Sequence, residues 1–277
     1  MRPTVEPATS DTDFRFAVET AKLQALYNFA YGLSHEINNP LANIATRAQT
    51  LLVDEQDPQR RRKLATIVQQ AFRAHEMIAD LMLFARPPTL RPAAVDLAKL
   101  ADTVVAEMHD QAREQDTQIV RSGDEGPLLA TVDPTQIAVA LKALVQNSLE
   151  AVRTGGSVEV SAELGTWSAE QAIPPPHFPH APPIAPHSVL RTPHFLLSVT
   201  DTGPGIPPEI RPHIFDPFFS GREAGRGLGL GLSKAWRIVE LHGGQILVDS
   251  EASQGARFTI VLPMATGVTS QRSEITT

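Results

Sequence analysis

The sequence predicts two folded parts: a helical hairpin that dimerises into a four-helix bundle, followed by a two-layer α/β sandwich. Up to Ala85, apolar residues recur every three or four positions, which is the spacing of amphipathic helices. After Pro92, short apolar strands alternate with helical segments, as expected for one mixed sheet under helices. The length of 277 residues also fits about two domains at roughly 100–200 residues each.

The first predicted helix contains a proline and a histidine that do not fit a simple packing role. Its apolar positions are Leu23, Leu26, Ala30, Leu33, Ile37, Leu41, Ile44, Ala48 and Leu51. Pro40 lies inside this pattern and lacks the N–H that would bond the carbonyl of Glu36, so we expect a bend one turn after His35. His35 lies two residues from both Leu33 and Ile37, which places it on the opposite face of the helix, toward solvent.

A second helix is predicted after a short acidic connection. Asp57 can cap this helix and Pro58 suits its first turn. Its apolar seam consists of Leu64, Val68, Ala71, His75, Ile78, Met82 and Ala85. We interpret His75 as a packing residue because it lies on this seam. A short connection makes the two helices antiparallel neighbours, and two helices alone cannot bury both seams, so we expect a homodimer.

The second part is predicted to hold three helices and six strands. Asp96 can cap a helix over Leu97–Glu114, and Asp133-Pro134 is a start signal for a helix that ends near residue 152. A third helix is expected over Leu230–Leu241, with Gly243-Gly244 as its C-cap. Strands are predicted at Gln118–Arg121, Leu128–Val132, Ser157–Glu163, Phe195–Thr200, Gln245–Ser250 and Arg257–Leu262.

Composition argues against several classes of protein. The net charge is −7, and without a concentrated basic face we expect no nucleic-acid partner. Cysteine is absent, which excludes disulfides, thiolate metal sites and cysteine catalysis. No apolar run reaches the ~18 residues that span a bilayer, so we expect no membrane insertion. Met1–Asp13 has no apolar core of a signal peptide, and a cytoplasmic location is expected.

Two glycine clusters indicate a site for an anionic ligand. The segment Asp201-Thr202-Gly203-Pro204-Gly205 follows an apolar strand and places a carboxylate at the strand end, beside a tight turn. The segment Gly225–Gly231 opens a predicted helix, where glycines allow close approach of phosphates and the helix N-terminus favours negative charge. Neither cluster has Walker or Rossmann spacing, and either one alone would indicate only a glycine-rich turn.

Together with three further segments, these clusters resemble the bacterial two-component histidine kinases over residues 20–262. The five segments, in family order, are the phosphoacceptor box at Ser34–Leu41, the asparagine box at Asn147–Ala151, the first glycine box at Asp201–Gly205, the phenylalanine box at Phe215–Phe219 and the second glycine box at Gly227–Gly231. The first has the His-Glu-x-Asn-Asn-Pro-Leu form of the nitrogen-regulation-like subgroup. The resemblance implies an ATP-binding domain of the gyrase, HSP90, histidine kinase and MutL superfamily.

The resemblance implies that the γ-phosphoryl group of ATP moves to His35 and then to the aspartate of a response-regulator receiver domain. A nucleophilic imidazole must be neutral, which its ordinary pKa near 6.5 permits at neutral pH. Glu36 is the expected base for the other ring nitrogen. Asn39, one helical turn after His35, is expected to orient a water that removes phosphate from the receiver. The alternative for Asn39 is that it only stabilises the bend at Pro40.

The resemblance also implies the nucleotide contacts. Asp201 should accept a hydrogen bond from the adenine amino group, and Asn147 should bind Mg²⁺ that bridges the phosphates. Five glycines should shape the pocket and its lid: Gly203, Gly205, Gly227, Gly229 and Gly231. Three cations are either phosphate partners or solvated lid charges: Arg222, Arg226 and Lys234.

Three departures from the family pattern leave alternatives open. Ala143 replaces an asparagine usually found four residues before Asn147, so a nucleotide-binding scaffold or a weakly active kinase remains an alternative. The run Gly225–Gly231 contains an extra Gly-Leu unit, which makes its register ambiguous. An insertion over 165–193 contains eight prolines, and four histidines lie in or beside it: His177, His180, His187 and His194. It is interpreted as an extended solvated loop rather than a metal site.

The predicted organisation follows from these segments. Residues 1–19 are expected to be flexible, residues 20–90 to form the dimerisation and phosphotransfer domain, and residues 91–264 to form the catalytic domain with the insertion 165–193. Residues 265–277 are expected to be a flexible tail. No sensor domain fits before residue 20, so we expect either a separate sensor protein as a partner or a sensor domain that the given sequence does not contain.

Overall fold

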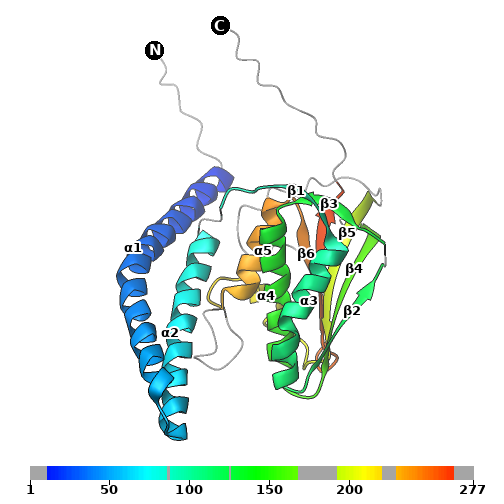
Figure 1. The fold of residues 1–277 in the computed structure, drawn as a ribbon. Helices are drawn as coiled ribbons and strands as arrows, with labels where there is room; N and C mark the ends of the chain where they lie inside the picture. The colour runs from blue at the N-terminus through cyan, green and yellow to red at the C-terminus, as the bar shows by residue number, and fades with distance from the viewer. Residues whose placement is uncertain (1–10, 86–87, 125, 168–191, 220–228, 265–277) are drawn as a thin grey trace, which may run out of the picture. The chain divides into compact units, whose positions relative to one another are not determined.

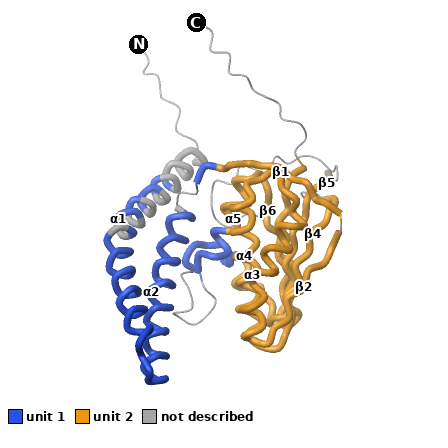
Figure 2. Tube along the Cα trace, in the orientation of Figure 1, with its two compact units in different colours: residues 1–89, 175–183, 212–234 blue, residues 90–174, 184–211, 235–277 orange. Residues whose placement is uncertain are grey.

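The computed structural model describes residues 11–85, 88–124, 126–167, 192–219 and 229–264. Some side chains of the first helix, including that of His35, also lie outside the described part. The chain divides into two compact units, which Figure 2 shows in different colours. The first unit holds the helical hairpin together with residues 212–219 and 229–234, and the second holds the β-sheets and most of the remaining helices.

The first unit is built on an antiparallel hairpin of α1 (Asp11–Asp54) and α2 (Pro58–Ala85), shown in Figure 1. The predicted cap of α2 is confirmed, because Asp57 Oδ1 accepts the N–H of Gln59 at 2.8 Å. Helix α1 begins before the predicted boundary at residue 20 and continues through Pro40. Figure 1 shows that α1 changes direction along its length, in keeping with the hydrogen bond that Pro40 cannot donate.

The hairpin buries only part of its apolar surface. Ala45 and Ala48 of α1 and Ala71 of α2 are buried between the helices. In contrast, three α1 residues spaced seven apart stay exposed in the single chain: Ile37 at 36 %, Ile44 at 48 % and Leu51 at 63 %. On α2, Ile67 and Phe72 are exposed as well. This row of apolar side chains fits the expectation that one hairpin cannot cover its own seams.

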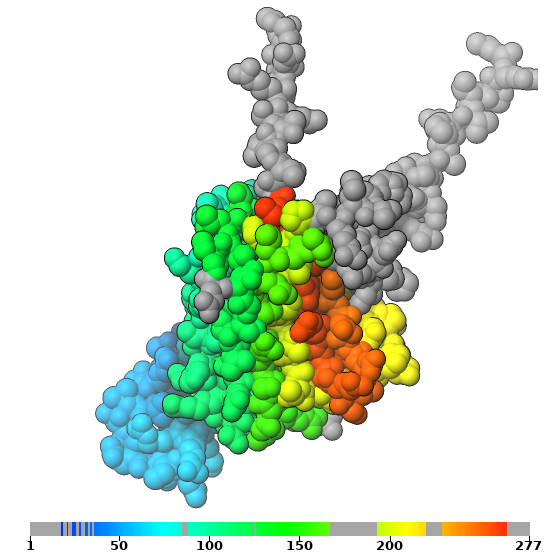
Figure 3. Space-filling view, turned by 90° about the vertical axis from the view of Figure 1, so that its right-hand side faces the viewer, coloured from blue at the N-terminus to red at the C-terminus, as the bar shows by residue number. Residues whose placement is uncertain are grey.

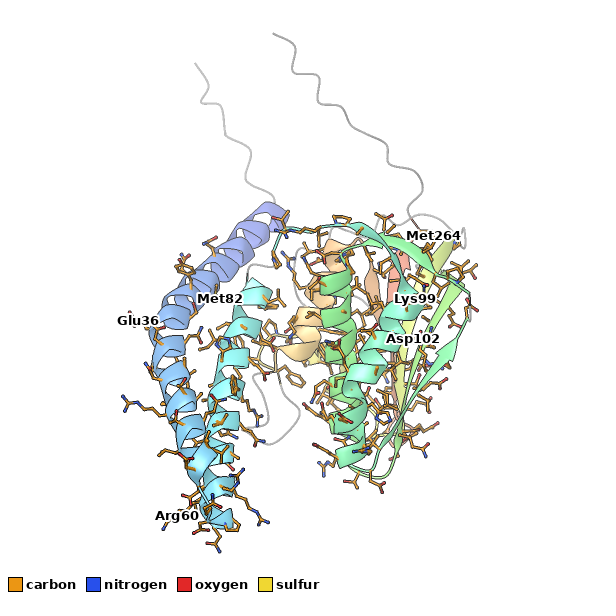
Figure 4. The ribbon with its side chains drawn as sticks, viewed as in Figure 1. Glu36, Arg60, Met82, Lys99, Asp102 and Met264 are labelled. Atoms are coloured by element: carbon orange, nitrogen blue, oxygen red, sulfur yellow. The ribbon has the colours of Figure 1, made fainter. Side chains whose placement is uncertain are left out.

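The tip of the hairpin carries a short basic run that the sequence analysis did not anticipate. Arg60, Arg61, Arg62 and Lys63 are consecutive and exposed in the first turns of α2, and Figure 4 labels Arg60 at the tip. Arg61 donates from Nη1 to the carbonyl oxygens of Leu52 at 3.1 Å and Glu55 at 3.3 Å. Arg61 therefore satisfies carbonyls at the C-terminal end of α1, where cations are favoured.

The second unit contains a five-stranded mixed sheet in the order β2-β4-β5-β7-β6 and a separate two-stranded sheet, β1-β3. Its elements are β1 (Ala93–Asp96), α3 (Leu97–Glu114), β2 (Gln118–Gly123), β3 (Leu129–Val132), α4 (Pro134–Val152), β4 (Ser157–Trp167), β5 (Thr192–Asp201), the end of α5 (Gly231–Leu241), β6 (Gln245–Ser250) and β7 (Ala256–Pro263). Strands β2 and β4 are parallel, and the other neighbours of the larger sheet are antiparallel. The predicted mixed sheet is confirmed, but the expectation of a single sheet is wrong because β1 and β3 pair apart from it.

Helices cover one face of the larger sheet, as Figure 1 shows, and the other face is turned toward the viewer in Figure 3. The core lies between the two layers. Alternate residues of the central strands are buried against α4, whose Leu141, Leu144 and Leu149 have no exposed surface. Burial of each such leucine is worth ~1.5–3 kcal/mol, so this interface fixes α4 on the sheet.

Local capping signals explain where the helices begin and end. Asp96 Oδ1 accepts the N–H of Ala98, and Asp133 Oδ1 accepts the N–H groups of Thr135 and Gln136, each at 3.1 Å. Gly243 has a φ of +69°, and the Gly244 N–H donates to the Val239 carbonyl at 2.9 Å. All three predicted caps are confirmed.

The insertion is carried at the end of a long hairpin of β4 and β5. Their antiparallel ladder runs from Val158 opposite Asp201 to Trp167 opposite Thr192. The ends of the predicted insertion are therefore strand rather than loop, and His194 lies on β5. Residues 168–191, with His177, His180 and His187, lie outside the described residues. Among the described residues, no three His, Asp or Glu side chains gather as a metal site.

No helix in the described part of the chain has both the length and the apolarity needed to cross a membrane.

Candidate active site

The carboxylate of Asp201 is fixed at the C-terminal end of β5. Asp201 is 3 % exposed, and its backbone pairs with Val158 of β4 and Ala256 of β7. Its Oδ2 accepts a hydrogen bond from the Ser148 hydroxyl at 2.9 Å, and its Oδ1 accepts the N–H of Gly203 at 2.9 Å. Both carboxylate oxygens therefore have a donor inside the protein, which offsets the cost of burying a polar group.

The first glycine box is a turn in which side chains would not fit. A Cβ on Gly203 would lie 2.8 Å from Asp201 Oδ1, and a Cβ on Gly205 would lie 2.0 Å from the Glu251 carbonyl oxygen. Gly205 also has a φ of +72°, a conformation that other residues rarely adopt. The Ile206 N–H donates to Ser250 Oγ at 2.8 Å. The loop is thus held against the end of β6 by this hydrogen bond and by close approach of the backbone at Gly205.

The asparagine box lies on α4, which brings it to the same end of the sheet as Asp201. Asn147 is half-buried and directly precedes Ser148, the residue that donates to Asp201. Ala143 is half-buried one helical turn earlier and supplies no oxygen there. Ser148 was missed by the sequence reasoning, although it lies inside the asparagine box, because only the tertiary structure brings it to Asp201.

The phenylalanine box meets the second glycine box at Gly229. The Phe218 N–H donates to the Gly229 carbonyl at 3.2 Å, and Phe218 and Gly229 both have a φ of +67°. A Cβ on Gly229 would lie 2.4 Å from the Phe219 carbonyl oxygen. Phe215 is buried, whereas Phe218 is exposed. The two ends of the segment 220–228 are therefore held side by side.

The remaining residues were predicted to contact the phosphates or to shape the pocket, and only some of them lie in the described part of the chain. Arg222, Arg226 and Gly227 lie outside the described residues. Gly231 is the first residue of α5, with open space where a Cβ would be. Lys234 follows in the first turn of α5, and its Nζ forms an ion pair with Asp80 of α2.

The phosphoacceptor box lies on α1, in the turn that contains Pro40. The backbone of His35 is helical, and its side chain lies outside the described part. Glu36 and Asn39 are exposed, and Figure 4 labels Glu36 on α1. The structure thus leaves both predicted partners of His35 accessible to a substrate.

The interpretation of His75 as a packing residue stays a prediction, because the expected second copy of the chain would cover this seam, but the single chain shows a polar contact that the sequence did not indicate. His75 is exposed on α2, and its Nδ1 lies 3.0 Å from Oδ1 of Asn38 on α1. A polar ring at the boundary of two helices gains more from a hydrogen bond than from burial among apolar side chains.

Two family models match the chain, in the order of its two predicted parts. The His Kinase A (phospho-acceptor) domain matches residues 25–89, and the Histidine kinase-, DNA gyrase B-, and HSP90-like ATPase matches residues 132–266. The chain is 31 % identical over 251 residues to the sensor kinase CckA of Brucella abortus (strain 2308), covering 88 % of this chain and 25 % of that protein. It is 31 % identical over 254 residues to the sensor protein FixL of Bradyrhizobium diazoefficiens, covering 90 % of this chain and 45 % of that protein. The chain therefore spans less than half the length of these relatives.

Solved structures share the fold. Full-length ShkA in complex with AMPPNP has a TM-score of 0.66 at 24 % identity, covering 87 % of this chain and 46 % of that one. Histidine kinase ThkA in complex with the response regulator TrrA has a TM-score of 0.58 at 22 % identity, covering 94 % of this chain and 68 % of that one.

A phosphoacceptor helical domain followed by a gyrase- and HSP90-like ATPase domain defines a histidine kinase. The chain belongs to the two-component sensor histidine kinases. The nitrogen-regulation-like subgroup rests on Ser34–Leu41 alone and stays a prediction.

Proposed function

We propose that this chain transfers the γ-phosphoryl group of ATP to His35 and then to an aspartate of a response-regulator receiver domain. The observation that carries the proposal is the buried Asp201 carboxylate, held by Ser148 and Gly203 in a domain that matches an ATPase family. The second support is the match of the phospho-acceptor family to the segment that contains His35.

Asp201 suits recognition of adenine. Its two oxygens are fixed by internal donors, and a carboxylate oxygen has a further lone pair to accept from an amino group. Adenine presents an amino group where guanine presents a carbonyl oxygen, and that oxygen would face the carboxylate without a proton between them. The glycine turn beside Asp201 keeps side chains away from the space next to the carboxylate.

Mg²⁺ fits the donor set only as an ion shared with the nucleotide. The described residues contain no cluster of acidic or histidine side chains that could hold it alone. Mg²⁺ commonly retains waters and binds through one or two protein oxygens plus substrate phosphates. We assign the side-chain oxygen of Asn147 to this role, where the ion would neutralise phosphate charge.

The reaction at His35 needs few protein groups. A ring nitrogen of neutral His35 forms the N–P bond, and the bond from phosphorus to the ADP oxygen breaks. Glu36 accepts the proton that the other ring nitrogen loses as the N–P bond forms, which leaves the phosphorylated ring neutral. In the transfer to the receiver, an aspartate oxygen forms a bond to phosphorus, the N–P bond breaks, and the His35 ring takes its proton back from Glu36. Asn39, exposed one turn after His35, is proposed to orient the water that later hydrolyses the phospho-aspartate.

We propose that a second copy of the chain packs against the exposed row Ile37, Ile44 and Leu51. Spacing of seven residues is that of a helical packing seam, so two hairpins can bury these rows against each other in a four-helix bundle. A cytoplasmic location is part of the proposal, because the reaction needs ATP.

Incubation with ATP labelled at the γ-phosphate tests the proposed function. The wild-type chain should take up label that is acid-labile and base-stable, whereas His35→Gln should take up none and still bind ADP. His109→Gln, an exposed histidine of α3, is the matched control and should label like wild type. Label on His35→Gln at a rate near wild type would contradict the assignment. A wild-type chain that binds ADP without labelling would favour the scaffold alternative marked by Ala143.

A further inference from the structure

The structure links α2 to the phosphoacceptor turn of α1 through one side-chain hydrogen bond. His75 Nδ1 and Asn38 Oδ1 lie 3.0 Å apart, although the residues are 37 positions apart in the chain. An amide oxygen only accepts, so the His75 ring donates from a protonated Nδ1. Asn38 itself lies between Glu36 and Pro40.

This turn of α1 lacks the restraints that hold an ordinary helix. Pro40 has no N–H to donate to the Glu36 carbonyl, and its ring crowds that carbonyl. Within a single chain, apolar packing does not replace the lost bond, since Ile37 and Asn39 on either side of Asn38 are exposed. A bond from a neighbouring helix is therefore a substantial part of what fixes the turn.

Asn38 is well placed to pass this restraint on to His35. Residues three apart occupy neighbouring positions on a helix surface, so Asn38 is next to the position of His35 on α1. Phosphoryl transfer depends on the placement of the nucleophile, and small displacements cost rate. We propose that His75 is a positioning residue, which holds Asn38 and thereby the phosphoacceptor turn in the geometry for phosphoryl transfer; this inference rests on the proposed function.

Initial rates of His35 labelling over a range of ATP concentrations test the proposal on the full chain. His75→Leu and Asn38→Leu should each lower kcat about fivefold, the effect of one lost hydrogen bond, with KM for ATP unchanged. The double variant should be no slower than either single variant, because both remove the same bond. His75→Gln should restore most of the rate, since its amide N–H can donate to Asn38.

Gln69→Leu on α2 is the control for an exposed polar-to-apolar change and should leave kcat unchanged. Helix content and melting temperature of His75→Leu should match this control. If the wild type takes up label and His75→Leu has the same kcat, the positioning role is overturned, whereas the proposed function is not. Additive losses in the double variant, or failure of His75→Gln to recover, would also overturn it. A wild type that takes up no label would overturn the proposed function and this inference together.

Discussion

At the scale of single residues, two buried aspartates have different roles. Asp133 uses its carboxylate inside the protein, accepting N–H groups of Arg91, Thr135 and Gln136. Asp201 is likewise anchored by Ser148 and by its own turn, but it lies beside a glycine loop that side chains cannot occupy. Substitution should therefore affect stability at Asp133 and ligand affinity at Asp201.

Asp201→Asn is expected to weaken ADP binding at least tenfold, about 1.4 kcal/mol, with little loss of stability. The amide has the shape of the carboxylate, and the Ser148 hydroxyl can turn to accept from its N–H₂ group. The charge that attracts the adenine amino group is lost. Calorimetric titration with ADP measures the change, with exposed Asp249→Asn on β6 as control. Equal affinity in Asp201→Asn and wild type would remove Asp201 from the site.

Asp133 should make the stability of the second unit depend on acid pH. Burial by itself would raise the pKa of Asp133, but hydrogen bonds from the N–H groups of Arg91, Gln136 and Thr135 outweigh it and lower the pKa. A lowered folded pKa stabilises the protein above the unfolded value near 4, and this gain disappears as pH falls through the folded pKa. Urea unfolding should show wild type more stable than Asp133→Asn at pH 7, with the difference shrinking below about pH 4. A difference that stays constant with pH would contradict this.

At the scale of elements, helix ends are decided by local chemistry and were predictable. Asp57, Asp96 and Asp133 cap the helices that their sequence context indicated, and Leu97–Glu114 is helical over the predicted bounds. Strand β1 was not predicted, because four residues carry little pattern and Ala93–Asp96 depends on pairing with distant β3. Arg61 was not predicted as a cap either.

Arg61→Ala should therefore destabilise the hairpin by about 1 kcal/mol, because two carbonyls near the end of α1 lose their donor. Neighbouring Arg62→Ala, which removes the same charge from an exposed position, should have a smaller effect. Thermal unfolding followed by helical circular dichroism compares the two. Equal losses in both variants would show that only the net charge at the tip matters.

Those parts of the candidate site that consist of consecutive residues can be predicted from the sequence. The boxes around His35, Asn147 and Asp201 each occupy a few consecutive residues, so the sequence reveals them. The contacts that Ser148 makes with Asp201 and that His75 makes with Asn38 form only in the folded chain. The first requires α4 to pack on β5, and the second requires α2 to lie beside α1. Periodicity placed His75 on a seam because it records spacing alone and does not detect a hydrogen-bond acceptor on another helix.

At the scale of the whole molecule, the exposed row on α1 predicts the assembly. Ile44→Lys should shift the full chain from twice the chain mass toward the monomer mass in light scattering, since it places a charge in the middle of the proposed seam. Val120→Lys, at an exposed apolar position of β2, is the control and should leave the mass unchanged. A wild-type chain that is already a stable monomer would exclude the bundle.

The long β4–β5 ladder also determines how strongly insertions or deletions between the two strands affect the free energy of folding. Because Trp167 pairs with Thr192, the two ends of the segment 168–191 are held at neighbouring positions by the sheet itself. The entropy of closing such a segment grows only with the logarithm of its length, about 0.6 kcal/mol for each doubling. We therefore expect a change in the number of residues between Trp167 and Thr192 to alter the free energy of folding little, so that a whole sequence module can be gained or lost beyond this end of the ladder while the sheet stays intact.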